Sequence, residues 1–575
     1  MRKNRKILFL AIFVGLCSGL AAVLLIQSIH LISWALKGWF NVPSQSFLYL
    51  VYPAIGMLIS YLIVRYVIKD NISHGVTKVL VAISKHDSKI KPHNTWSSLL
   101  TSAITIGFGG SVGAEAPIVY TGAAIGSNIG RKLGLSYKEI TLLLGCGAAG
   151  AISGIFKAPI TGVLFTLEIL LFNMSMSSIL PLVMSSITAA MVAYFLRGDA
   201  VTFTNTLTAF NFRNIPYYIV FGIICGFASL YFTRTTLKAE DILSKIKRPV
   251  NRWILCAVGL GILIFLFPPL YGEGYGVISN LLSGKEEISS IGNTIFVEYF
   301  GTSPWVLPIF FLAVFVLKVF SMSLTNAGGG VGGTFGPTLF MGGILGFVVA
   351  RSCNLLGMSV PETNFALVGM AGLMAGVMQA PLTAIFLIAE ITDGYTLLLP
   401  LIITSSISYA TIRSMEPYSI YTKRIAKQGL LLTHDSDQAV LTLLKVGNLI
   451  EKDFTQVNMS DTLGNLVAAV SSSKRNIFPV TDSAGMLHGV INLYDIKSVM
   501  FNRELYDTTY VYNYMRPVVE SIKPDERMDN VMNLFEASGV WNLPVIDKDG
   551  RYLGFVSKST IFSAYRELLQ QVSHD

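Results

Sequence analysis

Two glycine-rich stretches of the sequence carry residue types that suit an anion site. The first, GGSVGAEAP (109–117), contains Glu115, and the second, GGGVGGTFGP (328–337), has Phe335 at the corresponding position. Glycines let backbone N–H groups approach a ligand closely, and the N-terminus of a following helix carries partial positive charge. Together these features predict an anion site that needs no full positive charge. The alternative is that the glycines only allow helices to pack closely in a membrane.

Glu115 is the one acid within the two turns. A carboxylate at the centre of a membrane helix costs roughly 2.5–3.5 kcal/mol, so an acid there is expected to have a function. Beside an anion site Glu115 would be a tethered anion, which occupies the site when ionised and releases it when protonated. Such a group couples an anion path to protons. The alternative is an exposed glutamate at a helix N-terminus, where negative charge is also stabilised.

The elements that must position these turns are membrane helices. Of the 575 residues, 52% are hydrophobic and 13% are charged, whereas soluble domains have about 25% charged residues. Apolar runs recur between residues 7 and 412, and several are barely long enough, or too short, to span a bilayer. The Gly and Pro residues that interrupt them predict half-helices that meet inside the membrane. The basic N-terminus and the long apolar run after it predict a first membrane helix with a cytoplasmic N-terminus, rather than a cleaved signal peptide.

Several functional classes do not fit the composition. The five cysteines lie in separate apolar segments, and we expect buried small residues rather than disulfides or metal ligands. The formal net charge of +9 suits basic cytoplasmic flanks, and no basic patch with interleaved aromatics predicts binding to nucleic acid. Neither turn has the lysine of a P-loop, so nucleotide hydrolysis is not expected. We therefore expect no enzyme, no catalytic residues, no metal and no resident cofactor.

The membrane part contains an internal repeat. GAAGAISGIFKAPITGVLFTLE (147–168) aligns without gaps with GMAGLMAGVMQAPLTAIFLIAE (369–390), and the two glycine-rich turns are separated along the chain by almost the same offset. Order and spacing are thus kept across two halves, near 7–235 and 250–412. Internal symmetry of this kind is typical of a transporter core, with the substrate site where the repeats meet.

A soluble α/β module follows the membrane part. RNIFPVTDSAGMLHGVINLYDI (475–496) recurs as WNLPVIDKDGRYLGFVSKSTI (541–561). Each copy has a β-rich run, an Asp-x-x-Gly turn and a second strand, as a β-hairpin should. The predicted domains are a transmembrane domain at 1–428 and a module at 429–575, with copies near 444–500 and 512–570.

Two motifs resemble those of the CLC family of chloride channels and chloride/proton exchangers. GAEAP (113–117) is similar to the family's turn that carries the gating glutamate, here Glu115. GGTFGP (332–337) is similar to the turn whose phenylalanine, here Phe335, offers a backbone amide to the anion. The C-terminal repeat resembles the tandem CBS module that many members of this family carry in the cytosol.

Two further motifs follow the family's order. SHGVT (73–77) places His74 where the family usually has a serine, and SIYT (419–422) places Tyr421 as the tyrosine that hydrogen-bonds the anion. The resemblance implies that the anion-binding residues are His74, Gly75, Val76, Gly113, Ala114, Ala116, Thr334, Phe335 and Tyr421.

The resemblance implies an all-α polytopic membrane protein with two inverted-topology repeats of short and broken helices, followed by a cytosolic α/β tandem CBS module. It implies a homodimer in the lipid bilayer of the cell membrane, with one pathway per subunit for chloride or other small anions and for protons. The inverted halves place the basic linker 233–252 outside the cell, although the positive-inside rule would place it in the cytoplasm.

Some residues depart from the family pattern. Ala114 and Ala116 flank Glu115 in place of Arg or Lys and Gly. Thr77 replaces a usual proline, and His74 leaves the preference among chloride, nitrate and other anions open.

The departure that bears most on mechanism lies in FTLEI (165–169). Exchangers of this family commonly have a second glutamate there that relays protons from the cytoplasm, and here that position is Ile169. Glu168, one residue earlier, could be a surrogate in the proton pathway. Alternatively Glu168 and its repeat mate Glu390 are structural acids at helix ends. We favour chloride/proton exchange, and a passive, voltage- or pH-gated chloride channel stays open as the alternative.

The cleft of a CBS pair can bind an adenine nucleotide, and ribose-binding acids usually follow the second strand of each half. Asp495 fits this position, whereas Thr560 replaces the acid in the second half. The candidate nucleotide-binding residues are Asn492, Asp495, Ser557 and Thr560.

Two other functional classes fit the sequence less well than anion transport. A membrane-embedded enzyme would use Glu115, Glu168 and Glu390, but the sequence has no His pairs, metal spacing or Ser/His/Asp set beside them. A CBS-gated metal-ion transporter would need a cluster of intramembrane carboxylates, whereas this core has turns of the anion-binding type.

Overall fold

In the computed structural model, residues 2–40, 48–85, 87–170, 178–198, 207–283, 303–392, 395–427 and 444–573 are described. The chain divides into two compact units, Met1–Leu432 and Thr433–Asp575, and each is described by itself. The predicted domain boundary at 428/429 lies outside the described residues.

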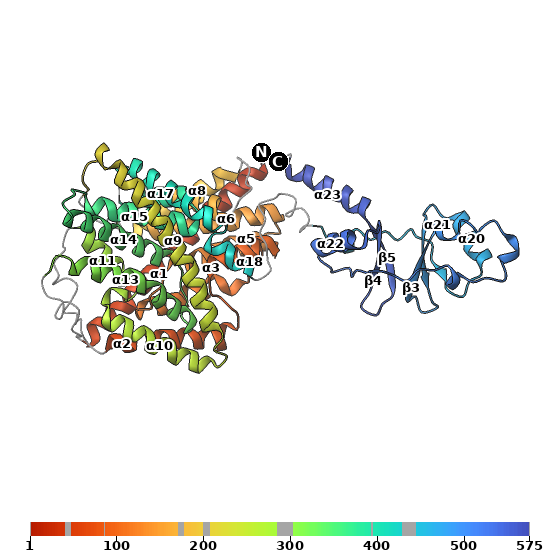
Figure 1. Cartoon of the computed structure of the whole chain (residues 1–575), viewed down its shortest axis with the longest axis horizontal. Coiled ribbons are helices and arrows are strands. Elements are labelled where there is room, and N and C mark those ends of the chain that lie inside the picture. The colour runs from red at the N-terminus through yellow and green to blue at the C-terminus, as the bar shows by residue number, and fades with distance from the viewer. Residues whose placement is uncertain are drawn as a thin grey trace. The chain divides into compact units, whose positions relative to one another are not determined.

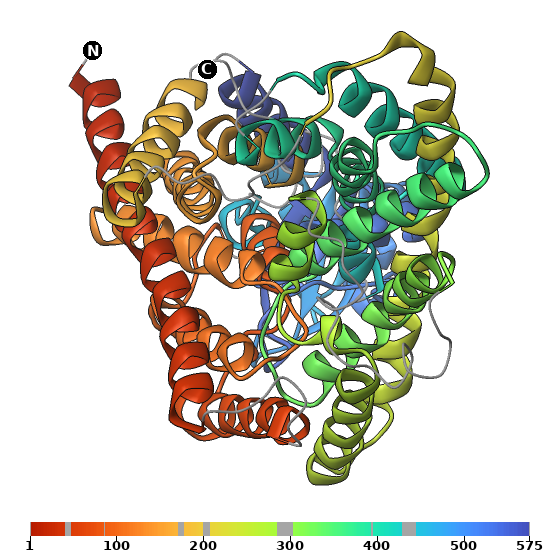
Figure 2. The same cartoon turned by 90° about the vertical axis from the view of Figure 1, so that its left-hand side faces the viewer.

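The first half of the helical unit runs from α1 to α8. Its longer elements are α1 (Arg2–Phe40), α2 (Leu48–Leu62), η1 (Ile63–Ile68), α3 (Gly75–Lys85), α4 (Ser97–Gly107), α5 (Glu115–Lys132), α6 (Tyr137–Phe156), α7 (Pro159–Phe165), η3 (Thr166–Leu170) and α8 (Ile179–Arg197). In the view of Figure 2, α1 runs along one edge of this unit.

The second half has a matching order. Its longer elements are α9 (Ile215–Ser244), α10 (Pro249–Leu266), α11 (Tyr275–Leu282), α13 (Val306–Ala327), α14 (Phe335–Leu355), α15 (Glu362–Met378), α16 (Pro381–Ile391), α17 (Leu398–Met415) and α18 (Ile420–Lys427). The linker at 233–252 is mostly helical, since it forms the end of α9 and the start of α10.

The lengths of these helices fit a membrane protein with broken helices. Among the described residues, eight helices are long and apolar enough to cross a membrane, and further apolar helices are only 10–17 residues long. Proline at the first turn starts both α7 and α16 after a break in the chain direction. The predicted polytopic helical fold with short and broken helices is confirmed.

Equivalent helices pack in equivalent ways in the two halves. Helices α1, α6 and α8 contact one another, as do α9, α15 and α17, and α5 packs on α6 as α14 packs on α15. Glycines allow the last two pairs to approach closely, because a Cβ at Gly122 would collide with the backbone of α6 and one at Gly342 with that of α15.

Contacts between the halves are reciprocal. Ser111 N–H donates to Thr325 Oγ1 at 3.1 Å. Val331 and Thr105 are the repeat mates of Ser111 and Thr325, and Val331 N–H donates to Thr105 Oγ1 at 3.0 Å. Each residue of such a pair contacts the repeat mate of the other one. This exchange requires a two-fold relation between the halves and not a simple translation. The sequence repeat therefore corresponds to two halves related by an internal two-fold axis.

The second unit contains two hairpin copies. Its strands and longer helices are β1 (Val457–Asn458), α20 (Leu463–Ser472), β2 (Ile477–Thr481), β3 (Leu487–Asn492), α21 (Leu493–Ile496), α22 (Met528–Ser538), β4 (Asn542–Ile546), β5 (Tyr552–Ser557) and α23 (Lys558–Ser573). Strand β1 pairs parallel with β2, while β2–β3 and β4–β5 are antiparallel with a register shift at the same place in each. In Figure 1, α20 and α21 accompany the first hairpin and α22 the second.

Each copy also contributes a residue to the sheet of the other. Glu451 bridges to Phe555 in β5, and Arg516, at the equivalent position of the second copy, bridges to Val490 in β3. Separate cores form beneath the two hairpins, with Phe478 and Ile491 in the first and Val545 in the second. The predicted hairpin in each copy is confirmed.

Candidate functional site

The two glycine-rich turns meet directly. Gly113 N–H donates to the Gly333 carbonyl at 3.0 Å, and Gly333 N–H donates to the Gly113 carbonyl at 2.7 Å. A side chain at Gly113 would collide with the Glu115 carboxylate and would place its Cβ 2.8 Å from Gly336 N. Gly109 and Gly329, which are repeat mates, have φ values of +92° and +103°, a region that L-residues rarely adopt. Helices α5 and α14 therefore begin beside each other.

Glu115 lies between these two helix starts. It is the first residue of α5 and is 1% exposed. Its Oε2 accepts a hydrogen bond from Gly336 N–H at 3.1 Å, and its Oε1 accepts one from the Tyr275 hydroxyl. The carboxylate of one half thus occupies the positive N-terminus of a helix from the other half. An exposed glutamate, the alternative drawn from the sequence, is not what the structure contains.

Two buried hydroxyls without partners lie in this region. Tyr421, in α18, is 2% exposed, and Thr334, directly before α14, is equally buried. Within the described part of the chain, neither hydroxyl makes a hydrogen bond. The Tyr421 hydroxyl lies near the hydroxyl of Thr334, and Glu115 acts on it electrostatically. An unpaired buried hydroxyl costs about 1–3 kcal/mol, so these two groups are suited to donate to a desolvated anion.

Phe335 begins α14 beside Thr334. It is 1% exposed, and its ring packs on those of Phe156 and Phe165, with centroids 5.6 and 6.3 Å away. This packing fixes the start of α14, so the backbone N–H groups there have a rigid direction. The predicted residues Gly113, Ala114, Ala116, Thr334, Phe335 and Tyr421 are all buried in this region.

The third turn approaches the same place from α3. A Cβ at Gly75 would collide with the Ala116 carbonyl, so α3 starts in close contact with α5. Val76 is buried, and His74 has a left-handed backbone with φ +57°. The His74 ring has an acid as a neighbour, because its Nε2 is 4.0 Å from the carboxylate of Glu240. The part of His74 in anion binding stays a prediction.

Three residues of the site were not predicted from the sequence: Glu273, Tyr275 and Lys318. Glu273 Oε1 accepts a hydrogen bond from Ala114 N–H at 3.1 Å, one residue before Glu115. Lys318 is 0% exposed in the middle of α13. Signals were available, since Lys318 interrupts an apolar run and Glu273 stands in a further glycine-containing turn, GEGY.

Glu168 and Glu390 make the same contacts in opposite directions. Glu168 accepts from Leu382 N–H at 3.1 Å and from Thr383 N–H and Oγ1 at 2.7 and 2.6 Å, at the start of α16. Glu390 accepts from residues 160 and 161 at the start of α7 in the same way. Each acid therefore caps a helix of the other half. These contacts favour the structural alternative, and the proton role of Glu168 stays a prediction.

Ile169 lies next to Glu168 in the π-helical turn η3 and is 4% exposed. It offers no group that accepts or donates a proton. The structure thus places no titratable side chain at the position where exchangers of this family commonly have one.

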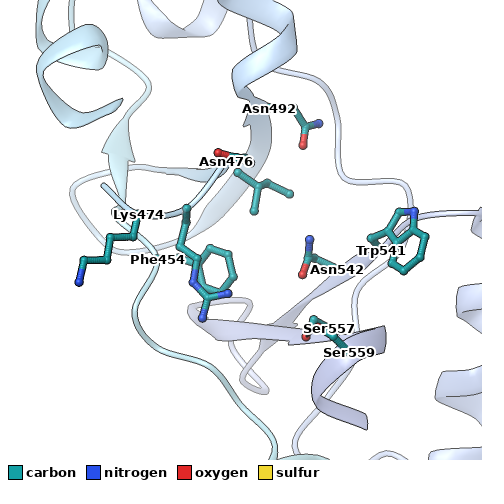
Figure 3. A pocket seen from close by; sticks show the side chains of 10 residues that line it. Phe454, Lys474, Asn476, Asn492, Trp541, Asn542, Ser557 and Ser559 are labelled. Atoms are coloured by element: carbon teal, nitrogen blue, oxygen red, sulfur yellow. Dashed lines mark hydrogen bonds between the residues drawn. The ribbon is translucent and has the colours of Figure 1, made fainter. Parts of the chain in front are cut away.

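The cleft between the CBS copies contains a cavity of about 350 Å³ (Figure 3). Its lining residues are Phe454, Lys474, Arg475, Asn476, Ile477, Asn492, Trp541, Asn542, Ser557 and Ser559. Of the four predicted nucleotide-binding residues, Asn492 and Ser557 line this cavity, and Asp495 and Thr560 are not among its lining residues.

Asp495 and Thr560 each have a partner within the module. Asp495 pairs with Arg516, and Thr560 donates to Glu451 at 2.6 Å. Glu451 and Arg516 are repeat mates. The acid Asp495 therefore faces the base Arg516, and the hydroxyl of Thr560 faces the acid Glu451 at the equivalent place. Burial by itself would raise the pKa of Glu451. The hydrogen bonds from the Ser557 and Thr560 hydroxyls and the charge of Arg475 together have the larger effect, so the pKa of Glu451 lies below its ordinary value. The loss of the acid at Thr560 follows from the glutamate opposite it.

Comparison with known proteins agrees with this architecture. The family model described as voltage gated chloride channel matches residues 55–413, and a CBS domain model matches residues 511–567. Because the first match covers more than half of the chain, the chain belongs to the CLC family, with a C-terminal CBS domain. This is a family of channels and transporters, so the protein is not an enzyme.

Individual relatives share about a quarter or less of their aligned residues with this chain. The chain is 27% identical over 456 residues to the H(+)/Cl(-) exchange transporter ClcA of Vibrio cholerae. The aligned region covers 75% of this chain and 92% of the relative. A slow cyanobacterial Cl-/H+ antiporter has a similar fold, with a TM-score of 0.62 at 22% identity over 73% of this chain and 97% of the antiporter. A eukaryotic CLC transporter also has a TM-score of 0.62, at 16% identity over 96% and 97% of the two chains. These structures confirm the CLC-type membrane fold.

The reciprocal caps predict equal effects of Glu168→Gln and Glu390→Gln. Each variant removes a negative charge from a helix N-terminus, and each should lower the free energy of unfolding by about 1–2 kcal/mol. Thermal unfolding in detergent measures this, and Glu536→Gln, at an exposed acid inside α22, is the control for the general cost of losing an acid.

The two variants should also have the same proton-to-chloride ratio as the wild type. A loss of proton movement in Glu168→Gln alone, at unchanged stability, would show that Glu168 relays protons and is not primarily a cap.

Proposed function

We propose that this chain transports chloride across the cell membrane in exchange for protons, with Glu115 as the gate. The observation that carries the proposal is the hydrogen bond that the Glu115 carboxylate accepts from Gly336 N–H, at the start of α14 in the other half. A carboxylate that binds there competes with a free anion for the same amide. Protonation removes the negative charge and with it the reason for the carboxyl group to stay.

The unpartnered hydroxyls of Tyr421 and Thr334 support an anion beside Glu115. No lysine or arginine is needed there, because two helix N-termini supply partial positive charge. A full positive charge would bind chloride more tightly and slow its release. This arrangement suits transport better than storage of an anion.

Exchange is favoured over passive conduction because Glu115 is buried and would carry protons together with chloride. The relative from Vibrio cholerae is described as an exchange transporter. The passive channel is the second candidate, and the apolar Ile169 favours it, since it interrupts the proton path of the common exchanger pattern.

We further propose that the protein is a homodimer in the lipid bilayer, with the N-terminus and the CBS module in the cytoplasm. The basic start of α1 supports the orientation of the N-terminus. Exposed apolar side chains along α8, α9 and α10, such as Phe195, Phe227 and Ile262, fit contact with lipid or with a second copy.

Proteoliposomes test the transport mode. With a chloride gradient across the membrane and a pH electrode outside, an exchanger moves protons against their gradient. If chloride flux occurs at every pH without any chloride-driven proton movement, the exchanger is ruled out and the passive channel is the remaining candidate. Absence of chloride flux under all conditions would contradict chloride transport itself.

Glu115→Gln mimics the protonated gate. Chloride flux should persist or rise, most of its pH dependence should disappear, and coupled proton movement should stop. Initial rates of chloride efflux from liposomes measure this, with Glu362→Gln as the control. Abolished flux, or an unchanged pH profile, would rule out the gating role.

Tyr421→Phe removes a hydroxyl but preserves the ring and its packing. If this hydroxyl donates to chloride, the Kd for chloride should rise roughly tenfold, because a hydrogen bond to a charged group contributes about 1.5–3 kcal/mol. Calorimetry on the detergent-solubilised protein measures it, and Tyr418→Phe is the matched control. An unchanged Kd would place the anion away from Tyr421.

We also propose that the CBS cavity binds an adenine nucleotide as a regulator. Lys474 supplies positive charge for phosphates, and Trp541 supplies an aromatic surface for a base, whereas Arg475 is already paired with Glu451 and Asp453 and lies over the ring of Phe454. Asp495 and Thr560 already have partners within the module and do not line the cavity, so the proposal rests on the residues that do line it (Figure 3).

Trp541→Ala should weaken binding of ATP or AMP at least about fivefold, since stacking on an aromatic contributes about 1–3 kcal/mol per base. Calorimetry measures it, with Tyr494→Ala as the control because Tyr494 is similarly exposed but does not line the cavity. A wild-type protein that binds neither nucleotide would contradict the proposal.

A further inference from the structure

A short turn at residues 272–274, together with Tyr275 at the start of α11, reaches the proposed anion site from the second half. Two side chains of this segment contact the gate region: Glu273 accepts from Ala114 N–H at 3.1 Å, and the Tyr275 hydroxyl donates to Glu115. The backbone of the turn is also attached there, because Gly272 N–H donates to the Gly109 carbonyl at 3.0 Å. The turn is therefore part of the site and not a connection that passes beside it.

The conformation of this turn is fixed. Gly272 and Gly274 have φ values of +66° and +87°, and a Cβ at Gly274 would collide with the ring of Phe340. Lys318 donates to the Gly272 carbonyl at 3.0 Å and to Ser111 Oγ at 2.8 Å, which ties the turn to the first glycine-rich stretch. Glu273 thus reaches Ala114 N–H from a rigid support.

Ala114 N–H is one of the backbone amides that the family resemblance assigns to the anion. In the structure it is already paired with a carboxylate, just as Gly336 N–H is paired with Glu115. Both amides stand at the start of a helix, one in α5 and one in α14. Two carboxylates of the protein therefore occupy donors that a chloride ion would use.

We propose that Glu273 is a second tethered carboxylate of the anion site, which must release Ala114 N–H, as Glu115 must release Gly336 N–H, before chloride can bind fully. The inference rests on the proposed chloride transport and adds a second proton-sensitive group to it. Glu115 is 1% exposed, and the two carboxylates accept from the starts of two different helices.

The charged and titratable groups around this pair come from several elements. Glu273 interacts electrostatically with Glu115 from α5 and with Lys318 from α13, and Tyr275 follows it at the start of α11. Glu115 in addition interacts with Tyr421 from α18. Like charges repel, so two ionised carboxylates near one another favour the loss of one charge by protonation. Acid should therefore open both contacts and increase chloride flux.

A different reading is that Glu273 serves only as the counter-charge of the buried Lys318. A buried ammonium group without a counter-charge is costly. In that case the carboxylate would matter for folding but not for the pH dependence of flux. The two readings differ in what happens when both charges are removed together.

The experiment compares the wild type with Glu115→Gln, Glu273→Gln and the double variant in proteoliposomes, from acid to neutral pH. Chloride flux through the wild type tests the proposed function by itself. We expect Glu115→Gln to retain a residual pH dependence, which disappears in the double variant. We also expect Glu273→Gln to bind chloride several-fold more tightly by calorimetry. If the double variant has the same pH profile and chloride Kd as Glu115→Gln, the inference is wrong.

The combination Glu273→Gln with Lys318→Met covers the case in which Glu273→Gln alone does not fold. It removes the carboxylate and the ammonium charge together, at nearly the same volume. A pH profile that lacks the Glu273 contribution supports the tethered carboxylate. A wild-type profile in this variant overturns the inference and leaves Glu273 as the counter-charge of Lys318.

Discussion

The arrangement of the membrane unit depends on the two hydrogen bonds between Gly113 and Gly333. They join the turns of the two halves back to back, and only glycine fits at Gly113 because a Cβ there would lie 2.2 Å from the Glu115 carboxylate and 2.8 Å from the backbone nitrogen of Gly336. With the turns joined, α5 and α14 start at the same place and their N-terminal amides face one region. Partial positive charge from two helices then accumulates without a buried lysine or arginine directed at the anion. The position of Glu115 between two helix N-termini follows from this one junction.

The protein fills this positive region with its own carboxylates. Glu115 and Glu273 replace water as partners of backbone amides, which reduces the cost of keeping an acid in an apolar environment. The same contacts make the acids removable, because a neutral carboxyl group has much weaker attraction to a helix N-terminus. Lys318 has a supporting part in this arrangement: its ammonium group is bound to Ser111 and to the turn before α11, so it positions donors and acceptors around the anion path.

Reciprocity is the feature that both units share. In the membrane unit, Glu168 and Glu390 cap each other's opposite helices, and in the CBS module Glu451 and Arg516 face the ends of the opposite hairpins. A duplicated unit that pairs with its copy across a two-fold axis exchanges equivalent contacts. Thr560 with Glu451 and Asp495 with Arg516 are two such contacts, made at equivalent positions with different residue types.

The sequence alone predicted the class of protein, the two repeats and the candidate site residues Glu115, Phe335 and Tyr421, because each of these predictions depends on a local motif or on a fixed spacing between similar segments. The hairpins of the module were equally predictable from alternating strands and Asp-x-x-Gly turns. Tertiary structure decided the partners. Glu273 contacts Ala114 and Lys318 contacts Ser111, and both pairs are far apart in the chain, so no local pattern relates such positions. The capping contacts of Glu168 exist for the same reason only after the halves have packed, since a carboxylate and a helix N-terminus attract each other according to their distance in space and not along the sequence.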